Sequence, residues 1–330
     1  MVTLKVMTWN VENLFQVGSA SGPKTQVDYT QKLTSLADVI LRLDPDILAL
    51  QEIGDVSALD DLVAQLDGRY PHIQVSNTPD RRGIRVGFLS KLTIESAEDI
   101  STFPLGSLST ITGQAEDRTT EITRLGRGAL RILVKPLPSI SLHLVTAHLK
   151  SKLLSFPGTA NRSRFTPKDE NERARGAGLA LLRRTAEAVA LRVKANEILE
   201  NNAEQSLILL GDFNDVTDAT TTQILQGPSG SQIGSRGFPR PDKGDDTRLF
   251  NLAPLIPIER RYSRIYRGNQ ELIDHIFVSQ EMLSGKSRQW PKVDSHTDLA
   301  DTLPSIEDRP SVRRGQPGSD HAPISAVFEL

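Results

Sequence analysis

Short apolar runs alternate with helical spacings along most of the chain. Apolar residues between Leu33 and Leu41 recur at i, i+3, i+4, i+7 and i+8, which predicts an amphipathic helix that ends before Pro45. A second, longer helix is predicted from Glu172 to Leu199. Strands are predicted at LKVMTWN, DILALQEI, RVGFLS, ALRILV, SLHLVTAHL, SLILLGDFN, LIDHIFVS and PISAVFEL. The alternation predicts an α/β fold.

Two stretches show neither the helical spacing of apolar residues nor an apolar run typical of a strand. Residues 101–126 are rich in Ser, Thr and Gly, and residues 227–246 in Gly, Pro and Asp, so both are predicted to be irregular. Long loops of this kind are either binding loops or tolerated surface insertions, and the pattern leaves both open. Because no linker or composition break divides the chain, we expect a single catalytic domain over residues 1–330.

Composition narrows the classes of function. The 330 residues include 39 Lys and Arg against 41 Asp and Glu, so any contact with a polyanion must come from a local basic patch. The absence of cysteine excludes disulfides, thiolate zinc sites and a cysteine nucleophile. With no signal peptide and no apolar run of membrane-spanning length, we expect a cytoplasmic monomer; a secreted protein without its leader would look the same.

Polar residues repeatedly stand where an apolar strand begins or ends. Loops that leave one common edge of a sheet form the usual binding site of such folds. Acceptors gathered there would make an oxygen-rich pocket, which suits a hard cation such as Mg²⁺ or Mn²⁺. The residues in question are Asn10, Glu52, His148, Asp212, Asn214, Asp274, Asp320 and His321.

Most of these residues also have a structural explanation when taken singly. The Asp320–His321 pair in GSDHAP is typical of a solvated turn before a strand, and Asn10 is typical of an Asx turn. Glu52 is different, because a carboxylate that ends a run as apolar as DILAL needs a cation or hydrogen-bond donors to offset its desolvation.

Six blocks together carry a family resemblance. TWNVENL, PDILALQEI, TAHLKSK, LLGDFND, LIDHIFVS and GSDHAP, in this order, resemble the endonuclease/exonuclease/phosphatase superfamily, which includes deoxyribonuclease I, AP endonucleases, inositol polyphosphate 5-phosphatases and neutral sphingomyelinases. The resemblance implies a four-layer α/β sandwich, with two mostly antiparallel β-sheets packed face to face and helices outside. It also implies metal-dependent hydrolysis of a phosphate ester.

The resemblance further implies residue roles. Glu52 is expected to be the principal ligand of Mg²⁺, with Mn²⁺ as an alternative ion, while Asn10 and Asp320 lie on the metal side. Asp212 is expected to position the attacking water and Asn214 to hold the phosphate.

Two histidines complete the expected catalytic set. His321 is expected next to the scissile phosphate and oriented by Asp274, and His148 is expected to donate to a phosphate or leaving oxygen. In deoxyribonuclease I the matching histidine pairs with a glutamate, for which the sequence offers no clear counterpart: Arg82 and Arg85 stand in that region.

Basic residues near these blocks are the candidates for substrate binding. We expect phosphate contacts from Arg82, Arg85, Lys150, Lys152, Arg162, Arg164 and Arg264. Tyr262 and Tyr266 lie among the arginines of 260–267, and basic residues next to aromatics suit nucleic acid.

We therefore expect a nuclease that cleaves nucleic acid by in-line attack of water. A phosphatase or phosphodiesterase for a small molecule or lipid headgroup is the alternative. A binding module that has lost catalysis is a third possibility, against which the intact set of Glu52, Asp212, Asn214 and His321 argues.

Overall fold

A computed structural model of the chain describes residues 2–106, 108–115, 118–158, 163–200, 205–227, 233, 247–283, 290–299, 303–307, 309 and 312–330. Its main helices are α1 (Gln26–Leu43), α2 (Val56–Ala64), α3 (Glu170–Leu199), α4 (Thr220–Gln226) and α5 (Gln280–Leu283). Across the described part of the chain, no helix has both the length and the apolar character needed to cross a membrane.

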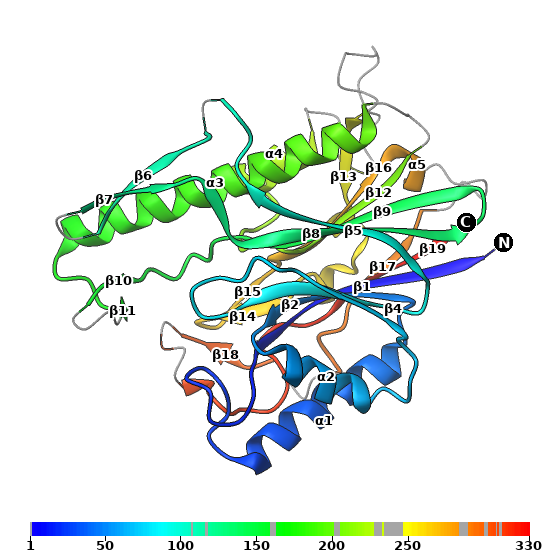
Figure 1. Cartoon of the computed structure of the whole chain (residues 1–330), viewed down its shortest axis with the longest axis horizontal. Coiled ribbons are helices and arrows are strands. Elements are labelled where there is room, and N and C mark those ends of the chain that lie inside the picture. Colours follow the sequence, from blue (N-terminus) through cyan, green and yellow to red (C-terminus); the bar gives the residue numbers. More distant parts are fainter. Residues whose placement is uncertain are drawn as a thin grey trace.

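Two large mixed sheets form the centre of the molecule (Figure 1). The first has the order β17-β19-β1-β2-β4-β3, and the second has the order β13-β16-β12-β9-β8-β5. The strands of the first are β1 (Thr3–Leu14), β2 (Ile47–Ile53), β3 (His72–Val75), β4 (Arg85–Ser90), β17 (Lys292–Ser295) and β19 (Ile324–Glu329). Those of the second are β5 (Ile94–Thr102), β8 (Arg124–Leu137), β9 (Ile140–His148), β12 (Ser206–Asp212), β13 (Leu249–Asn251) and β16 (Asp274–Ser279).

Smaller strand pairs lie outside these sheets. They are β6 (Ile111–Ala115) with β7 (Arg118–Ile122), β10 (Phe156–Pro157) with β11 (Ser163–Arg164), and a sheet in the order β15-β14-β18. The last consists of β14 (Arg264–Tyr266), β15 (Asn269–Glu271) and β18 (Ser305–Ile306).

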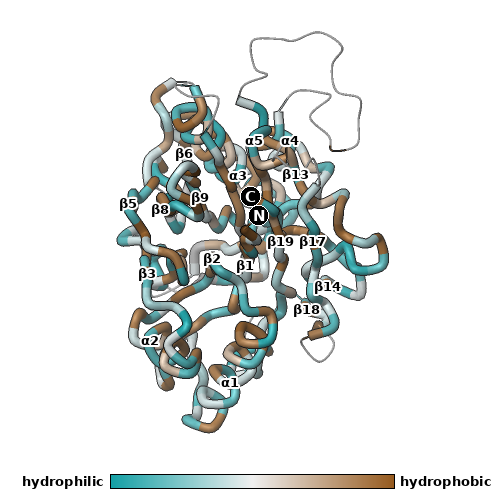
Figure 2. The backbone as a smooth tube through the Cα atoms, turned by 90° about the vertical axis from the view of Figure 1, so that its right-hand side faces the viewer, coloured by the Kyte–Doolittle hydropathy of each residue, from teal (hydrophilic) through white to brown (hydrophobic). Residues whose placement is uncertain are grey.

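Three hydrophobic clusters hold four layers together. Val6, Phe88, Ile132 and Ile208 belong to the cluster between the two sheets. The next residue on β1, Met7, points the other way and belongs to the cluster that packs the first sheet on α1 and α2, as the alternation of a strand requires. A third cluster packs the second sheet on α3 and α4. Figure 2 shows the resulting order, with α1 and α2 below the strands and α3 and α4 above them. The predicted four-layer α/β sandwich is confirmed.

The strand directions bring the predicted site residues to one edge. β1 and β2 are parallel, as are β9 and β12, so each pair ends at the same side of its sheet. β19 runs antiparallel to β1, and β16 runs antiparallel to β12, so these two strands begin where the others end. This edge lies opposite the two chain termini (Figure 1).

Most of the predicted elements are present, but one prediction was wrong. Residues 101–126 were expected to be irregular, whereas they include the β6–β7 hairpin and the start of β8. The sequence of this stretch lacks the sustained apolar/polar alternation that signals a strand, and pairing of residues 111–115 with 118–122 defines the hairpin. Most of residues 227–246 lie outside the described residues.

Candidate active site

Asp212 lies at the centre of the site, at the end of β12. Its side chain is fully buried, and its Oδ2 accepts a hydrogen bond of 3.0 Å from Asn10 Nδ2 on the other sheet. Its Oδ1 accepts from the backbone N–H of Asn214 at 2.9 Å. Burial and the neighbouring charge of Asp274 raise the pKa of Asp212 to about 7. A carboxyl group with such a pKa can exchange a proton near neutral pH.

His321 forms the predicted pair with Asp274. His321 Nδ1 lies 2.7 Å from Asp274 Oδ2, and both side chains are buried. Burial by itself would lower the pKa of His321, but the charges of Asp274 and Asp212 raise it to about 10. The backbone fixes the ring from behind, because Trp9 Nε1–H donates to the carbonyl of His321 and Ser319 Oγ accepts from its N–H. His321 is therefore held as a cation facing the pocket.

His148 approaches Asp212 from the end of β9. Its Nε2 lies 3.2 Å from Asp212 Oδ2 and 3.9 Å from Glu52 Oε1. Burial and the charge of Arg127 keep the pKa of His148 well below its usual value, so the ring is neutral. Its Nδ1 is buried without a hydrogen-bond partner among the described residues.

Glu52 faces the same pocket from β2. Its Oε2 accepts a hydrogen bond of 2.9 Å from the backbone N–H of Asn13. Glu52, Asn13, Asn214 and Glu12 all adopt positive φ. For residues other than glycine this costs on the order of 1–3 kcal/mol each, and such strain gathers at functional sites. The backbone is bent so that these polar side chains reach the pocket.

Glu12 was missed by the sequence analysis. Arg313 donates to both of its carboxylate oxygens, at 3.2 and 2.8 Å, and the backbone N–H of Asp320 donates to Oε2 at 3.1 Å. Burial and the charge of Asp320 raise the pKa of Glu12 to about 7. Glu12 stands two residues after Asn10 on the same strand, and this spacing was the available signal.

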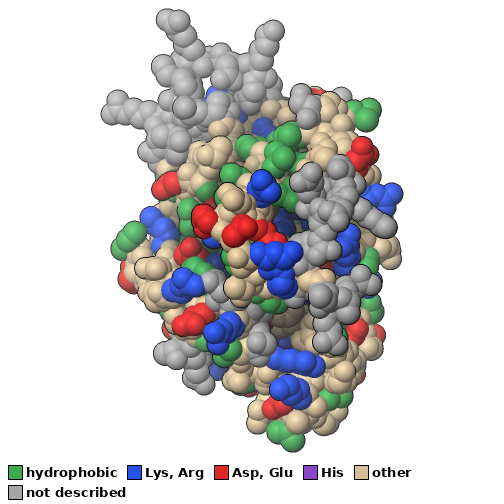
Figure 3. Space-filling model, turned by 90° about the vertical axis from the view of Figure 1, so that its left-hand side faces the viewer, with side chains coloured by type: hydrophobic (Ala, Val, Ile, Leu, Met, Phe, Trp, Pro, Cys, Tyr) green, Lys and Arg blue, Asp and Glu red, His purple; other side chains and the backbone are tan. Residues whose placement is uncertain are grey.

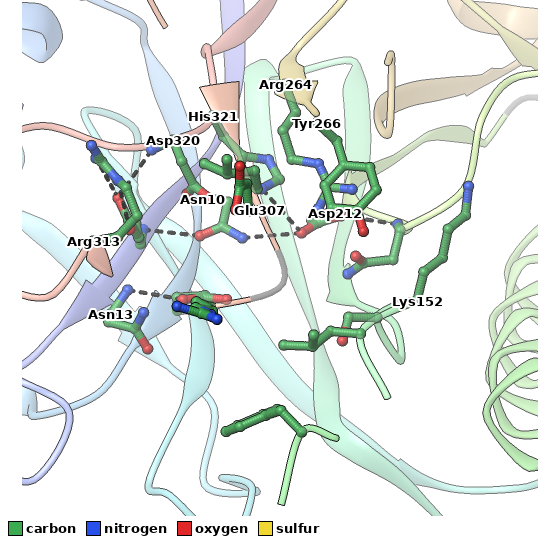
Figure 4. A pocket seen from close by; sticks show the side chains of 18 of the residues that line it. Asn10, Asn13, Lys152, Asp212, Arg264, Tyr266, Glu307, Arg313, Asp320 and His321 are labelled. Carbon is green, nitrogen blue, oxygen red and sulfur yellow. Dashed lines mark hydrogen bonds and ion pairs between the residues drawn. The ribbon is translucent and has the colours of Figure 1, made fainter. Parts of the chain in front are cut away.

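These residues line one pocket of about 770 Å³. Figure 4 shows Asn10, Asp212, Asp320 and His321 pointing toward its centre. Of the predicted site residues, those that line it are Asn10, Glu52, Arg82, His148, Lys152, Asp212, Asn214, Arg264, Asp320 and His321. Asp274 stands behind His321. Figure 3 looks at this end of the molecule, where Lys and Arg side chains lie next to acidic ones.

Several predicted substrate contacts do not reach the pocket. Arg85 donates to the carbonyl of Gly83, and Lys150 Nζ donates to the carbonyls of Ser151 and Leu153. Arg164 is bound to Glu172 and lies over the ring of Phe156. These three are absent from the residues that line the cavity, and Arg162 lies outside the described residues. Their basic character alone could not indicate where the side chains point.

Besides Arg173 on α3, three further arginines line the pocket without having been predicted. Arg127 is on β8, and Arg309 and Arg313 precede the GSDHAP block. Arg127 Nε lies 3.5 Å from Asp80, to which Arg82 also pairs. None of the three lies in one of the six blocks, so a motif search had no reason to select them.

The donor set fits a divalent cation. The carboxylates of Asp212 and Asp274 have oxygens within 4.8 Å of each other, next to His321. Asp274 Oδ1 is fully buried without a hydrogen-bond partner among the described residues, which is costly for a carboxylate unless a cation is near. Glu52, Glu12 and Asp320 bring three more carboxylates to the same pocket. Hard oxygen donors of this kind suit Mg²⁺ or Mn²⁺.

Comparisons with known proteins agree with this geometry. Residues 7–321 match the sequence profile of the Endonuclease/Exonuclease/phosphatase family. Among curated proteins, none matches the chain by sequence.

Solved structures share the fold at low sequence identity. Truncated TDP2 from Caenorhabditis elegans is 16% identical with a TM-score of 0.57, over 99% of this chain and 98% of that one. Sphingomyelinase C from Streptomyces griseocarneus is 16% identical with a TM-score of 0.58, over 100% of both chains. TDP2 from D. rerio, complexed with a single-strand DNA product, is 17% identical with a TM-score of 0.53, over 99% of both.

Proposed function

The chain belongs to the endonuclease/exonuclease/phosphatase family of metal-dependent phosphoester hydrolases, and on that premise we propose that it is a nuclease that uses Mg²⁺ to hydrolyse phosphodiesters of nucleic acid. The observation that carries the proposal is the convergence on Asp212. Asn10 from one sheet and His148 from the other both contact its Oδ2, at 3.0 and 3.2 Å.

Glu52, Asn10 and Asp320 are the proposed metal-side residues. Each lines the pocket, and their oxygens suit Mg²⁺, with Mn²⁺ as an alternative. Asp212 and Asp274 are further acidic groups within reach of such a site. A bound divalent cation would supply Lewis acidity and neutralise charge on the phosphate.

Each of the remaining residues has a separate role in the in-line attack of water on the phosphate. Asp212 orients the water and accepts its proton. His321, kept cationic by Asp274 and Asp212, stabilises the charge that develops on the phosphoryl oxygens. His148 donates from its neutral ring to a phosphate or leaving oxygen, and Asn214 holds the phosphate. No covalent intermediate is needed.

The rim of the pocket supports nucleic acid as the substrate. Arg82, Arg127 and Arg309 supply positive charge, and the half-exposed ring of Phe165 offers a surface on which a base can stack. The structural likeness to a TDP2 that was complexed with single-strand DNA agrees with this choice but shows only the shared fold.

A phosphodiester of a small molecule or lipid headgroup is the second candidate. Apolar side chains also line the pocket, among them Leu153, Leu154, Ile306 and Val312. Such a wall could hold an organic group that is not a base.

Two assays distinguish the candidates. Supercoiled plasmid and single-stranded DNA are incubated with the protein and Mg²⁺, in parallel with phosphocholine esters and other soluble phosphoesters. We expect cleavage of DNA that EDTA abolishes and that Glu52→Gln and His321→Ala reduce by at least about 10²-fold. Glu281→Gln, which changes an exposed glutamate of α5, is the matched control and should retain activity.

If DNA stayed intact in both Mg²⁺ and Mn²⁺ while a small ester was cleaved, the second candidate function would replace the nuclease assignment. Full activity of Glu52→Gln and His321→Ala would contradict the site itself.

A further inference from the structure

Arg264 enters the pocket from a hairpin that belongs to neither large sheet. It opens β14, which pairs with β15 through Arg264 opposite Glu271, and β18 pairs with the other side of β14. Gly268, with a φ of 78°, stands in the turn of the hairpin. Arg264, Tyr266 and Glu271 all line the pocket. None of the three lies in the six sequence blocks that carry the family resemblance.

Neighbouring side chains hold the guanidinium of Arg264 in place. One terminal nitrogen lies 2.8 Å from Glu271 Oε2, and the guanidinium carbon lies 5.4 Å from the centre of the Tyr266 ring. The side chain is 14% exposed. A planar cation held by a carboxylate and an aromatic face has a fixed direction, which a lysine could not reproduce.

Within the described part of the chain, one nitrogen of this group has no acceptor: Arg264 Nε is buried and has no hydrogen-bond partner there. Leaving a buried donor unsatisfied costs about 1–3 kcal/mol, and more for a charged group. A ligand oxygen in the pocket would satisfy it.

The guanidinium lies beside the reacting groups. Figure 4 shows Arg264 and His321 extending toward Asp212 from the same side. The charge of Arg264 is among those that lower the pKa of Asp212, against the larger effects of burial and Asp274 that raise it. The positive charge of Arg264 thus interacts with the carboxylate of Asp212, which the proposed reaction uses.

Arg127 also has a buried Nε without a hydrogen-bond partner among the described residues, but its guanidinium lies 3.5 Å from Asp80 and donates to the carbonyl of Leu149. Three other cations of the pocket are more fully engaged or more exposed than Arg264. Arg313 gives two nitrogens to Glu12, and Lys152 lies 3.0 Å from Asp215 with 40% of its side chain exposed. Arg82 is 47% exposed. Arg264 combines burial, a donor without an acceptor among the described residues, and a place beside Asp212 (Figure 4).

We propose that Arg264 is a further catalytic residue, whose guanidinium donates to a non-bridging oxygen of the scissile phosphate, with Glu271 and Tyr266 as positioning residues. The inference rests on the proposed function and deepens it. Because the oxygen gains charge as water attacks, the contact strengthens in the transition state and should act mainly on kcat.

The test uses the full chain with Mg²⁺ and thymidine 5′-(4-nitrophenyl phosphate), a chromogenic phosphodiester. We expect Arg264→Ala to lower kcat/KM by about 10²–10³-fold, mostly through kcat, with an unchanged melting temperature. Arg264→Lys should recover little, and added guanidinium ion should restore part of the activity of Arg264→Ala. Glu271→Gln should lower kcat less than Arg264→Ala does.

The control is Arg69→Ala, which removes another arginine paired with a carboxylate, Asp44 at 3.0 Å, outside the pocket. It should leave kcat unchanged. An active wild-type protein with an equally active Arg264→Ala overturns this inference alone. A loss of activity that accompanies a lowered melting temperature and that guanidinium does not reverse assigns Arg264 a structural role and overturns it too.

A wild-type protein that cleaves no phosphodiester contradicts the proposed function and this inference together. The failure of each is therefore distinguishable.

Discussion

His148 and His321 approach the same carboxylate, Asp212, in opposite electrostatic surroundings. Near His321 stand the acidic groups of Asp274 and Asp212, which raise its pKa to about 10 despite its burial. Burial, together with the positive charges of Arg127 and His321, lowers the pKa of His148 well below its usual value. Two imidazoles that differ in charge at neutral pH can take different roles in one reaction.

The raised pKa of His321 makes stability depend on pH. Its folded-state value of about 10 exceeds the unfolded value of 6.5, so the stabilisation is complete below pH 6.5 and is lost as the pH rises toward 10. For the metal-free protein in EDTA, we expect the free energy of unfolding to fall over this interval by up to about 1.4 kcal/mol per pH unit.

Denaturant unfolding at a series of pH values measures this dependence, and His321→Gln is the comparison, because glutamine does not titrate. The variant should show a flatter dependence between pH 6.5 and 10. If the free energy of unfolding depended on pH in the same way for both proteins, the charges of Asp274 and Asp212 would not keep His321 protonated.

The sequence predicted individual residues well where a motif surrounded them. Asp274 and His321, which are 47 positions apart, form the expected pair. Glu12 and Arg313 could not be predicted as a pair, because 301 positions separate them and no sequence pattern links the two. Arg85 and Lys150 show the reverse case, since both were predicted as phosphate contacts but donate to backbone carbonyls.

At the scale of elements, β12 must pass very close to β9 to deliver Asp212. Gly211 precedes Asp212 with a φ of 150°, and a Cβ added there would lie 2.0 Å from the carbonyl oxygen of Ala147. No side chain fits this position without moving one of the two parallel strands. The glycine therefore places Asp212 next to His148, which pairs with it in register.

Gly211→Ala should destabilise the protein by roughly 1–3 kcal/mol through the clash, in addition to the strain of the backbone angle. It should also lower kcat, because Asp212 would shift. Gly68→Ala is the matched control: Gly68 has a φ of 69° but no atom within 4 Å of an added Cβ, so only about 1–2 kcal/mol of strain applies.

Thermal and denaturant unfolding compare the two variants, and steady-state kinetics reports on the site. If Gly211→Ala were as stable and as active as the wild type, close approach of β9 and β12 would not set the position of Asp212.

The strands that end at the site were predictable because their apolar runs are long and their polar ends abrupt. The β14–β15–β18 sheet was not, since each of its strands has only two or three residues and no apolar face. Long-range pairing rather than local preference defines such strands, as in the contact between residues 265 and 305.

At the scale of the whole molecule, positive and negative side chains are concentrated at one pocket although the net charge is small. The net charge is only −2, yet arginines from β8, β14 and the segments around 82 and 309–313 face one pocket with the carboxylates at its floor. Acidic groups at the base would attract a divalent cation, while the arginines would attract the phosphate. The two-sheet sandwich makes this possible because both parallel strand pairs end at the same edge.

The central claim is that this edge of the fold binds a divalent cation. The most direct test is to titrate the metal-free protein with Mn²⁺ and to monitor the electron paramagnetic resonance signal of the free ion. We predict that the wild-type protein binds Mn²⁺, that Glu52→Gln weakens binding by at least about tenfold, and that Glu281→Gln leaves it unchanged. Equal Mn²⁺ affinity of the wild type and Glu52→Gln, or no binding by the wild type, would contradict the claim.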